Sequence, residues 1–212
     1  MKKLILSVAA ALLCALPASA EEVVRTFQKQ LSAGDVESIH IDIPVGELEI
    51  EAGDGPQVET RVELLCKNTK PRCLEAARNV RFVYSTDDGR LHFQLKDWPK
   101  TNTRGLQVRA LFTVPRTLPL RTELGVGELT VNGLEADLQV DLGVGEVNVT
   151  MPETAVGSVN LDTGIGEADL RAGGRHYTSE GLFVREIHWN KGKGQASVEV
   201  DCGVGEINVA LK

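Results

Sequence analysis

Aromatic residues, histidines and serine-nucleophile motifs are scarce in this sequence. Phe, Trp and Tyr make up 4% of its 212 residues, whereas glycine occurs 21 times. That combination is typical of repetitive β-structure with a thin aliphatic core. The four histidines include no i,i+4 helical pair and have no cysteine at metal-ligand spacing. A Gly-x-Ser-x-Gly elbow is also missing. The sequence therefore predicts no catalytic residue, no metal site and no enzyme.

Basic residues are outnumbered, which bears on possible partners. The chain has 23 Lys and Arg against 30 Asp and Glu. Loss of Lys2 and Lys3 with a cleaved leader would leave 21 against 30, a net charge of −9. Such a surface repels phosphate backbones, so nucleic acid is not an expected partner.

The long apolar run needed to cross a membrane is absent, since a span requires about 18 consecutive apolar residues. Residues 1–20 instead read as a signal peptide, with two lysines, the apolar run Leu4–Leu16 and the small-residue site Ala18-Ser19-Ala20. Leu13 before Cys14 does not fit a lipid-attachment site, which normally has a small residue there. We expect a periplasmic or secreted protein that begins at Glu21.

One short unit recurs along the chain. Its copies are PVGELEI, GVGELTV, GVGEVNV, GIGEADL and GVGEINV, at Pro44–Ile50, Gly125–Val131, Gly143–Val149, Gly164–Leu170 and Gly203–Val209. The second glycines of the last four copies are 18, 21 and 39 residues apart. The longest interval suggests two units, with a degenerate copy around Gly181–Val184.

The phase of apolar alternation changes at each Gly-Glu pair. Apolar residues alternate before the pair, as in a strand with one buried face, and resume afterwards with the opposite parity. Gly-Glu is therefore either a corner in a stacked solenoid or a two-residue hairpin turn. We favour an all-β, β-solenoid-like stack (β-helix or β-roll), because copies at near-constant spacing suit coils in register.

The rest of the chain is less regular. Strand-like alternation appears at Ile39–Val45, Val58–Leu64, Val80–Tyr84, Leu91–Leu95 and Leu106–Val114, with one short helix at Arg72–Asn79. Residues 21–212 are expected to form a single repetitive β domain. Its irregular part covers 21–120 and its regular Gly-x-Gly-Glu repeats cover 121–212, with a soft boundary at Pro115 and Pro119.

The features of the chain follow a definite order. An early repeat copy comes first, and after it come an irregular insert, the Val114-Pro115 step and tandem Gly-x-Gly-Glu strands. This order resembles the bacterial putative-adhesin family of exported β-strand-repeat domains, a domain of unknown function. The resemblance implies a fold and an exported location much more strongly than an activity. No cofactor is expected, because the Gly-x-Gly pairs lack the third glycine and the following helix of a dinucleotide fingerprint.

Two classes of function remain. The favoured class is a non-catalytic envelope module, adhesin-like, that binds an unknown envelope protein or a glycan; a module that senses envelope stress is a variant of it. The second class is a small polysaccharide-active β-helix enzyme, but Trp98 and Trp189 are the only tryptophans that could stack on a sugar. His40 lies in the polar phase of a strand and is expected at the solvated surface.

The cysteines suggest one bridge and one core residue. Cys66 and Cys73 flank a polar loop and would form a disulfide in an oxidising compartment. Cys202 lies in the apolar phase between Val200 and Val204 and is expected to be buried. The sequence ends soon after Val209, so the last repeat either packs within the chain, which we favour, or self-associates with a second molecule.

A glutamate follows the second glycine of every repeat, at Glu47, Glu128, Glu146, Glu167 and Glu206. In stacked coils, neighbouring copies would lie about 4.8 Å apart, and their charges would repel by about 1 kcal/mol in water. Splaying into solvent, Arg or Lys partners, or bonds from backbone N–H groups would offset this repulsion. A second possibility is that the glutamates form a column that attracts cations or a basic partner. A third is that the repeats are hairpins, which would keep the glutamates apart from one another.

The leader gives the first testable prediction. Signal cleavage should remove residues 1–20 and leave Glu21 as the first residue. Intact-mass measurement of the exported protein should match residues 21–212. A mass that includes a diacylglyceryl group on Cys14 would refute this cleavage site.

Overall fold

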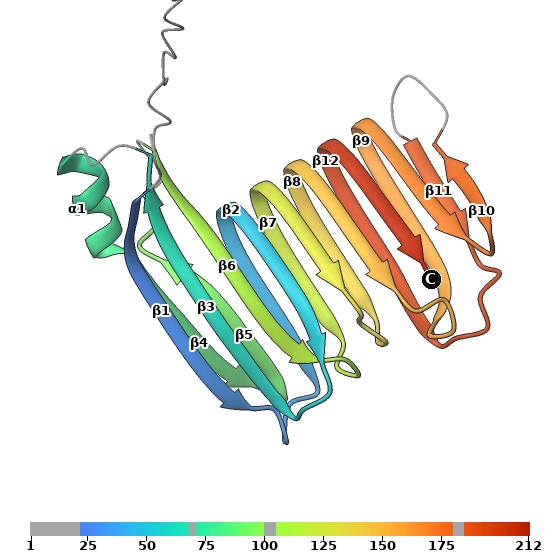
Figure 1. The fold of residues 1–212 in the computed structure, drawn as a ribbon, viewed down its shortest axis with the longest axis horizontal. Helices are drawn as coiled ribbons and strands as arrows, with labels where there is room; N and C mark the ends of the chain where they lie inside the picture. The colour runs from blue at the N-terminus through green and yellow to red at the C-terminus, as the bar shows by residue number, and fades with distance from the viewer. Residues whose placement is uncertain (1–21, 68–70, 100–104, 180–184) are drawn as a thin grey trace, which may run out of the picture.

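The computed structural model describes residues 22–67, 71–99, 105–179 and 185–212, and the described chain is almost entirely β-structure (Figure 1). The strands and the single helix α1 are β1 Glu22–Ser32, β2 Ser38–Gly53, β3 Gln57–Cys66, α1 Pro71–Asn79, β4 Arg81–Asp87, β5 Arg90–Lys96, β6 Leu106–Pro115, β7 Leu120–Asn132, β8 Leu138–Met151, β9 Val156–Ala172, β10 Arg175–Thr178, β11 Arg185–Trp189 and β12 Ala196–Leu211. The predicted all-β class with one short helix is confirmed.

All the described strands belong to one sheet, with the order β1-β3-β6-β2-β7-β8-β12-β9-β10 along its main path. The five strands that carry the repeat copies, β2, β7, β8, β12 and β9, are consecutive and parallel. Their motifs are in register, so that Gly46 pairs with Gly127, Gly127 with Gly145, Gly145 with Gly205 and Gly205 with Gly166. β2, from the irregular part of the sequence, is thus the first member of the stack.

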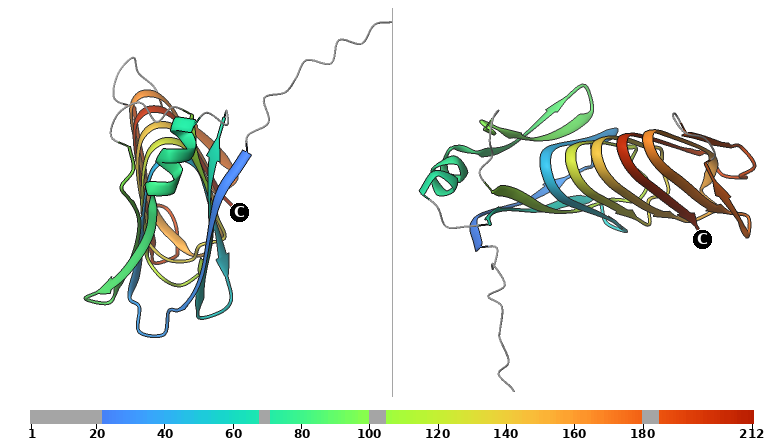
Figure 2. Two further views of the ribbon diagram at one scale, coloured as in Figure 1. Left: turned by 90° about the vertical axis from the view of Figure 1, so that its left-hand side faces the viewer. Right: turned by 90° about the horizontal axis from the view of Figure 1, so that it is seen from above.

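Each repeat strand is bent at its Gly-x-Gly motif, and its two halves form facing walls (Figure 2). The residues on both sides of Gly-Glu belong to the same strand and pair in parallel with the same neighbours. A hairpin turn would instead pair the two halves with each other, antiparallel. The hairpin interpretation is therefore wrong, and the parity change marks a bend within a single strand.

The core lies between the two walls. Before the bend, Leu138, Val140 and Leu142 point inward, and after it Val147 and Val149 do so, all nearly inaccessible to solvent. The equivalent side chains of neighbouring strands stack on them in register and form one continuous aliphatic core. Cys202 occupies one of these inward positions at 3% exposure, so its predicted burial is confirmed.

The last repeat does not stack in chain order. β12 lies between β8 and β9 and pairs in parallel with both, Val209 being opposite Val149 on one side and Leu170 on the other. The last repeat therefore packs within the chain. Its two hydrogen-bonded neighbours remove the open strand edge that would have favoured self-association there.

The 39-residue interval between the last two repeat glycines is described only in part. Its described part contains β10 and β11, two short strands that pair antiparallel with β9 at the end of the sheet. The degenerate copy expected around Gly181–Val184 lies outside the described residues.

At the other end, β1, β3 and β6 pair antiparallel, and α1 lies beside them (Figure 1). The predicted disulfide between Cys66 and Cys73 is present and ties the helix to the end of β3. The Arg25 guanidinium donates hydrogen bonds to the carbonyl oxygens of Ala77, Arg78 and Val80, at 3.1, 2.9 and 2.7 Å. A cation at the carboxyl end of a helix satisfies its free carbonyls and complements its dipole.

The bend depends on close backbone contact between neighbouring repeats. Gly145 has a φ of 144°, and a Cβ added there would lie 1.8 Å from the carbonyl oxygen of Gly127. At Gly143, the added atom would lie 2.4 Å from the carbonyl oxygen of Gly125. Glycine is needed at both positions because the backbone of the next repeat occupies the place of a side chain.

Gly145→Ala should therefore destabilise the protein strongly. Positive φ and a backbone clash combine, so we expect a loss of at least about 3 kcal/mol in the free energy of unfolding, or failure to fold. The control is Gly55→Ala, since a Cβ at Gly55 meets nothing within 4 Å. Urea denaturation of both variants checks this, and equal stabilities would contradict the assigned role of the bend.

Candidate functional site

The surface around the bend is the candidate functional site, because the register repeats each outward side chain five times. The glutamates of the motif form one such set, here called the glutamate row: Glu47, Glu128, Glu146, Glu206 and Glu167. The structure places all the predicted glutamates side by side, in an order that follows the strands of the sheet. Glu146 and Glu167, neighbours in the sequence repeat, are separated by Glu206.

Several side chains offset the charge of the glutamate row. Nε of Arg109 lies 3.1 Å from Oε2 of Glu47. Nδ2 of Asn148 donates a hydrogen bond of 2.9 Å to Oε1 of Glu146, which also accepts a longer one, of 3.5 Å, from Asn208. Among the described residues, one arginine and two amides thus offset part of the charge of Glu47 and Glu146.

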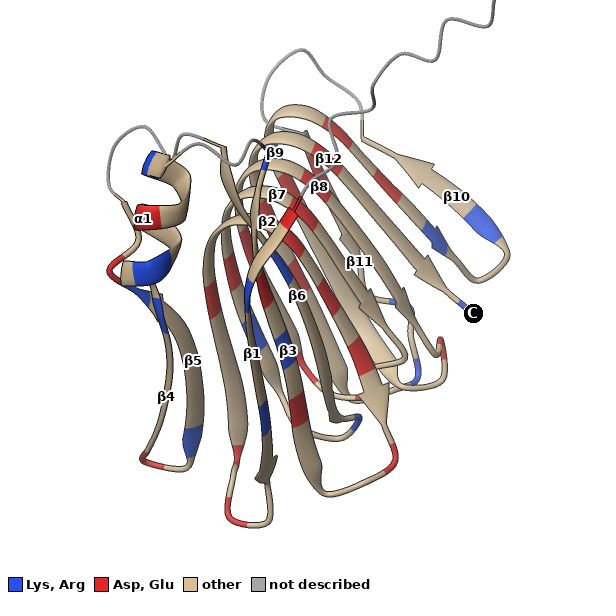
Figure 3. Ribbon diagram, turned by 60° about the vertical axis from the view of Figure 1, so that its left-hand side comes forward, with Lys and Arg blue, Asp and Glu red and all other residues tan. Residues whose placement is uncertain are grey.

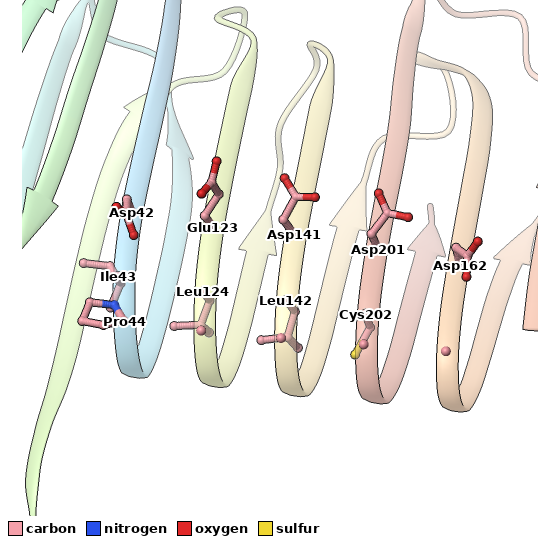
Figure 4. Close-up of a pocket in the computed structure, with 14 residues that line it drawn as sticks. Asp42, Ile43, Pro44, Glu123, Leu124, Asp141, Leu142, Asp162, Asp201 and Cys202 are labelled. Carbon is pink, nitrogen blue, oxygen red and sulfur yellow. The ribbon is translucent and has the colours of Figure 1, made fainter. Parts of the chain in front are cut away.

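A second line of carboxylates was not foreseen in the sequence. It runs along the other wall and comprises Asp42, Glu123, Asp141, Asp201 and Asp162, here called the acidic row (Figure 4). Figure 4 shows one carboxylate on each successive strand. The signal was available, because an acidic residue stands five positions before every repeat glutamate. Figure 3 shows acidic residues crossing the repeat strands in bands.

The acidic row is only partly neutralised. Arg121 lies 2.8 Å from Asp141 and 3.1 Å from Glu123. Among the described residues, Asp42, Asp162 and Asp201 have no ion-pair or hydrogen-bond partner. Burial and then Glu123 raise the pKa of Asp42, and the nearby His92 and His40 partly offset this rise. Desolvation and then the Asp141 and Asp162 charges raise the pKa of Asp201. The β12 and β9 end of the row therefore carries the least compensated negative charge.

A shallow groove of 660 Å³ runs between the acidic row and the bend. Where it crosses the strands it is lined by Gly125, Gly143, Gly203 and Gly164, which have no side chains. The groove is a consequence of the backbone contact at the bend. Its carboxylate side makes it suited to positively charged groups.

His40 is not at the solvated surface, contrary to expectation. Its side chain is 16% exposed, and its ring stacks on His92 with the centroids 4.3 Å apart. Burial and then the neighbouring His92 lower the pKa of His40. The sequence could not show this, because β2 and β5 become neighbours only in the folded sheet.

Two features of the described residues bear on metal binding and on stacking against sugars. No group of three or more His, Cys, Asp and Glu within them is arranged to hold a metal ion. Trp189 is 4% exposed and lies in the core, so it is not a platform for stacking on sugars. None of the described helices has the length and apolar character to cross a membrane.

Comparison with known proteins gives the family. Residues 19–171 match the model described as the N-terminal domain of toast_rack, DUF2154. The chain therefore belongs to this family, a domain of unknown function, and the resemblance to the putative adhesins is confirmed. No curated protein shows significant similarity to the chain.

Solved structures are similar to this chain at low sequence identity. A putative cell adhesion protein from Clostridium sporogenes shares the fold; it is 18% identical with a TM-score of 0.55, over 89% of this chain and 99% of that protein. A putative adhesin from Bacteroides fragilis is 12% identical with a TM-score of 0.37, over 87% and 97% of the two chains.

Asp201→Asn should stabilise the protein at neutral pH. The change removes repulsion by three neighbouring carboxylates, those of Asp141, Asp162 and Glu199, and with solvent screening we expect a gain of about 0.5–1 kcal/mol in the free energy of unfolding. Because the folded-state pKa of Asp201 is raised, its protonation favours folding at low pH, and this contribution is lost as pH rises.

The advantage of the variant over the wild type should therefore grow as pH rises from 3 to 7 and shrink in high salt. Urea denaturation across this range measures it, with the exposed Asp35→Asn as the control. A variant less stable than the wild type at pH 7 would refute the assigned repulsion.

Proposed function

We propose that this protein is an exported, non-catalytic binding module of the bacterial envelope, adhesin-like, whose repeat stack presents a surface to a protein or glycan. The observation that carries this proposal is the register of the repeats. It multiplies each outward side chain into a row of five, giving an extended uniform surface rather than a single converging site.

Further features support the proposal. The signal-like residues 1–20 favour a periplasmic or secreted location, and the disulfide suits an oxidising compartment. The Clostridium sporogenes protein of this fold is described as a putative cell adhesion protein. We further propose that the bent parallel repeats act as a solenoid-like scaffold, in which stability comes from contacts between neighbouring repeats.

The test is capture from envelope extracts by the mature, tagged protein. We expect one protein or glycan to be retained reproducibly by the folded protein. A sample unfolded by reduction and urea, then returned to buffer immediately before use, is the control for non-specific adsorption.

Incubation with envelope polysaccharides tests in parallel whether the protein is a polysaccharide-active enzyme. Newly formed reducing or unsaturated ends would show glycan cleavage and overturn the proposed function. Equal retention by folded and unfolded protein would do the same.

A further inference from the structure

A line of exposed aliphatic side chains follows the crest of the bend. It consists of the middle residue of each Gly-x-Gly motif, here called the aliphatic ridge: Val126, Val144, Val204 and Ile165, with the half-buried Val45 at the equivalent position of β2. Val126, Val144 and Val204 are 47, 46 and 43% exposed, and Ile165 is 60% exposed. Single exposed aliphatic residues are ordinary, but an aligned set marks a candidate interaction surface.

The fold itself does not require apolar residues on the crest. The bend is made by the flanking glycines, and the ridge side chains point away from the core. Other outward positions of the same strands are polar, as in the row that pairs Thr130 with Asn148 and Asn148 with Asn208. The ridge is therefore an exception among the outward positions of these strands, most of which carry polar side chains.

Negative charge borders the ridge on both sides. The acidic row lies three residues before it in each strand, and the glutamate row two residues after it. A second copy docked through the same face would bring like-charged rows together, and anionic glycans or lipids would also be repelled. An occupant with an apolar stripe between positive charges is complementary to this surface.

The dimensions suit a helix that lies along the ridge. Five strands at about 4.8 Å spacing extend over about 19 Å between the outermost two. An α-helix advances about 5.4 Å per turn, so about one turn faces each repeat and about 13 residues cover the ridge. Long basic side chains on one flank would reach over the glycine-lined groove to the acidic row.

We propose that the aliphatic ridge and its two carboxylate rows form a docking surface for a cationic amphipathic helix of a partner protein. Aliphatic residues of the helix contact the ridge, and lysines or arginines on its flanks pair with the rows. Binding is strongest over β8, β12 and β9, where Asp201 and Asp162 have no partner among the described residues. This inference rests on the proposed function and names the partner's chemistry.

The probe is a fluorescent 14-residue peptide of leucine and lysine, with the leucines on one helical face. Its binding to the full mature protein is measured by fluorescence anisotropy at low and high salt. Two comparison peptides are used, one with glutamate in place of lysine and one with the same composition scrambled. We expect saturable binding of the first peptide only, weakened at least tenfold at high salt.

Two sets of variants locate the binding. Val144→Thr, Val204→Thr and Ile165→Thr together keep β-branched side chains but remove the apolar crest. Asp201→Asn with Asp162→Asn removes two charges and keeps the side-chain shape. Each set should weaken peptide binding at least tenfold, whereas the control Asp35→Asn with Asp87→Asn, which removes two exposed charges elsewhere, should change it less than twofold.

Unchanged binding by the ridge or row variants, an equal loss in the control, or equal binding of the scrambled peptide would overturn the inference. Circular dichroism melting shows whether each variant remains folded. The envelope capture experiment repeated with the ridge variant separates the two proposals. If the ridge variant still captures the partner of the wild type, the proposed function stands and this docking surface is wrong.

Discussion

The backbone contact between neighbouring repeats at the Gly-x-Gly bend is the constraint on which the rest of the structure depends. At Gly145 the carbonyl oxygen of Gly127 occupies the space that any Cβ would need. This contact holds the bend of each strand beside the bend of its neighbour. It thereby fixes the register of the strands along both walls. The aliphatic core between the walls follows from that register, because equivalent inward residues stack on one another.

The same register determines the electrostatics of the surface. A carboxylate in one repeat faces the equivalent carboxylate in the next, so a motif that is harmless once becomes a line of like charges. Arg109, Arg121 and Asn148 offset part of this charge. Towards β12 and β9 the acidic row has fewer such partners, and there desolvation and neighbouring charges raise the pKa of Asp201.

Local patterns in the sequence predicted a large part of this structure, whereas long-range arrangement was harder to foresee. The alternation of apolar residues identified the inward residues on both sides of the bend. The burial of Cys202 and the Cys66–Cys73 disulfide were also correctly predicted, because spacing and side-chain chemistry are informative over short stretches.

The long-range arrangement of the strands could not be predicted in this way. Near-identical repeats do not differ in any way that indicates their spatial order, so the spacing did not predict the insertion of β12 between β8 and β9. The stacking of His40 on His92 likewise depends on strands paired only in the folded sheet. The acidic row could have been found, since its residues keep a constant distance from the motif glutamate.

The core and the crest of the bend are under different physical demands. Inward positions need apolar side chains, and the motif glycines need to be small, so the fold accounts for both. The ridge and the carboxylate rows meet neither demand, because the ridge side chains are only partly buried and aligned carboxylates repel one another. These three rows follow one another around the bend of the repeat strands, and the proposed contact with a partner would account for side chains that the stability of the fold does not require.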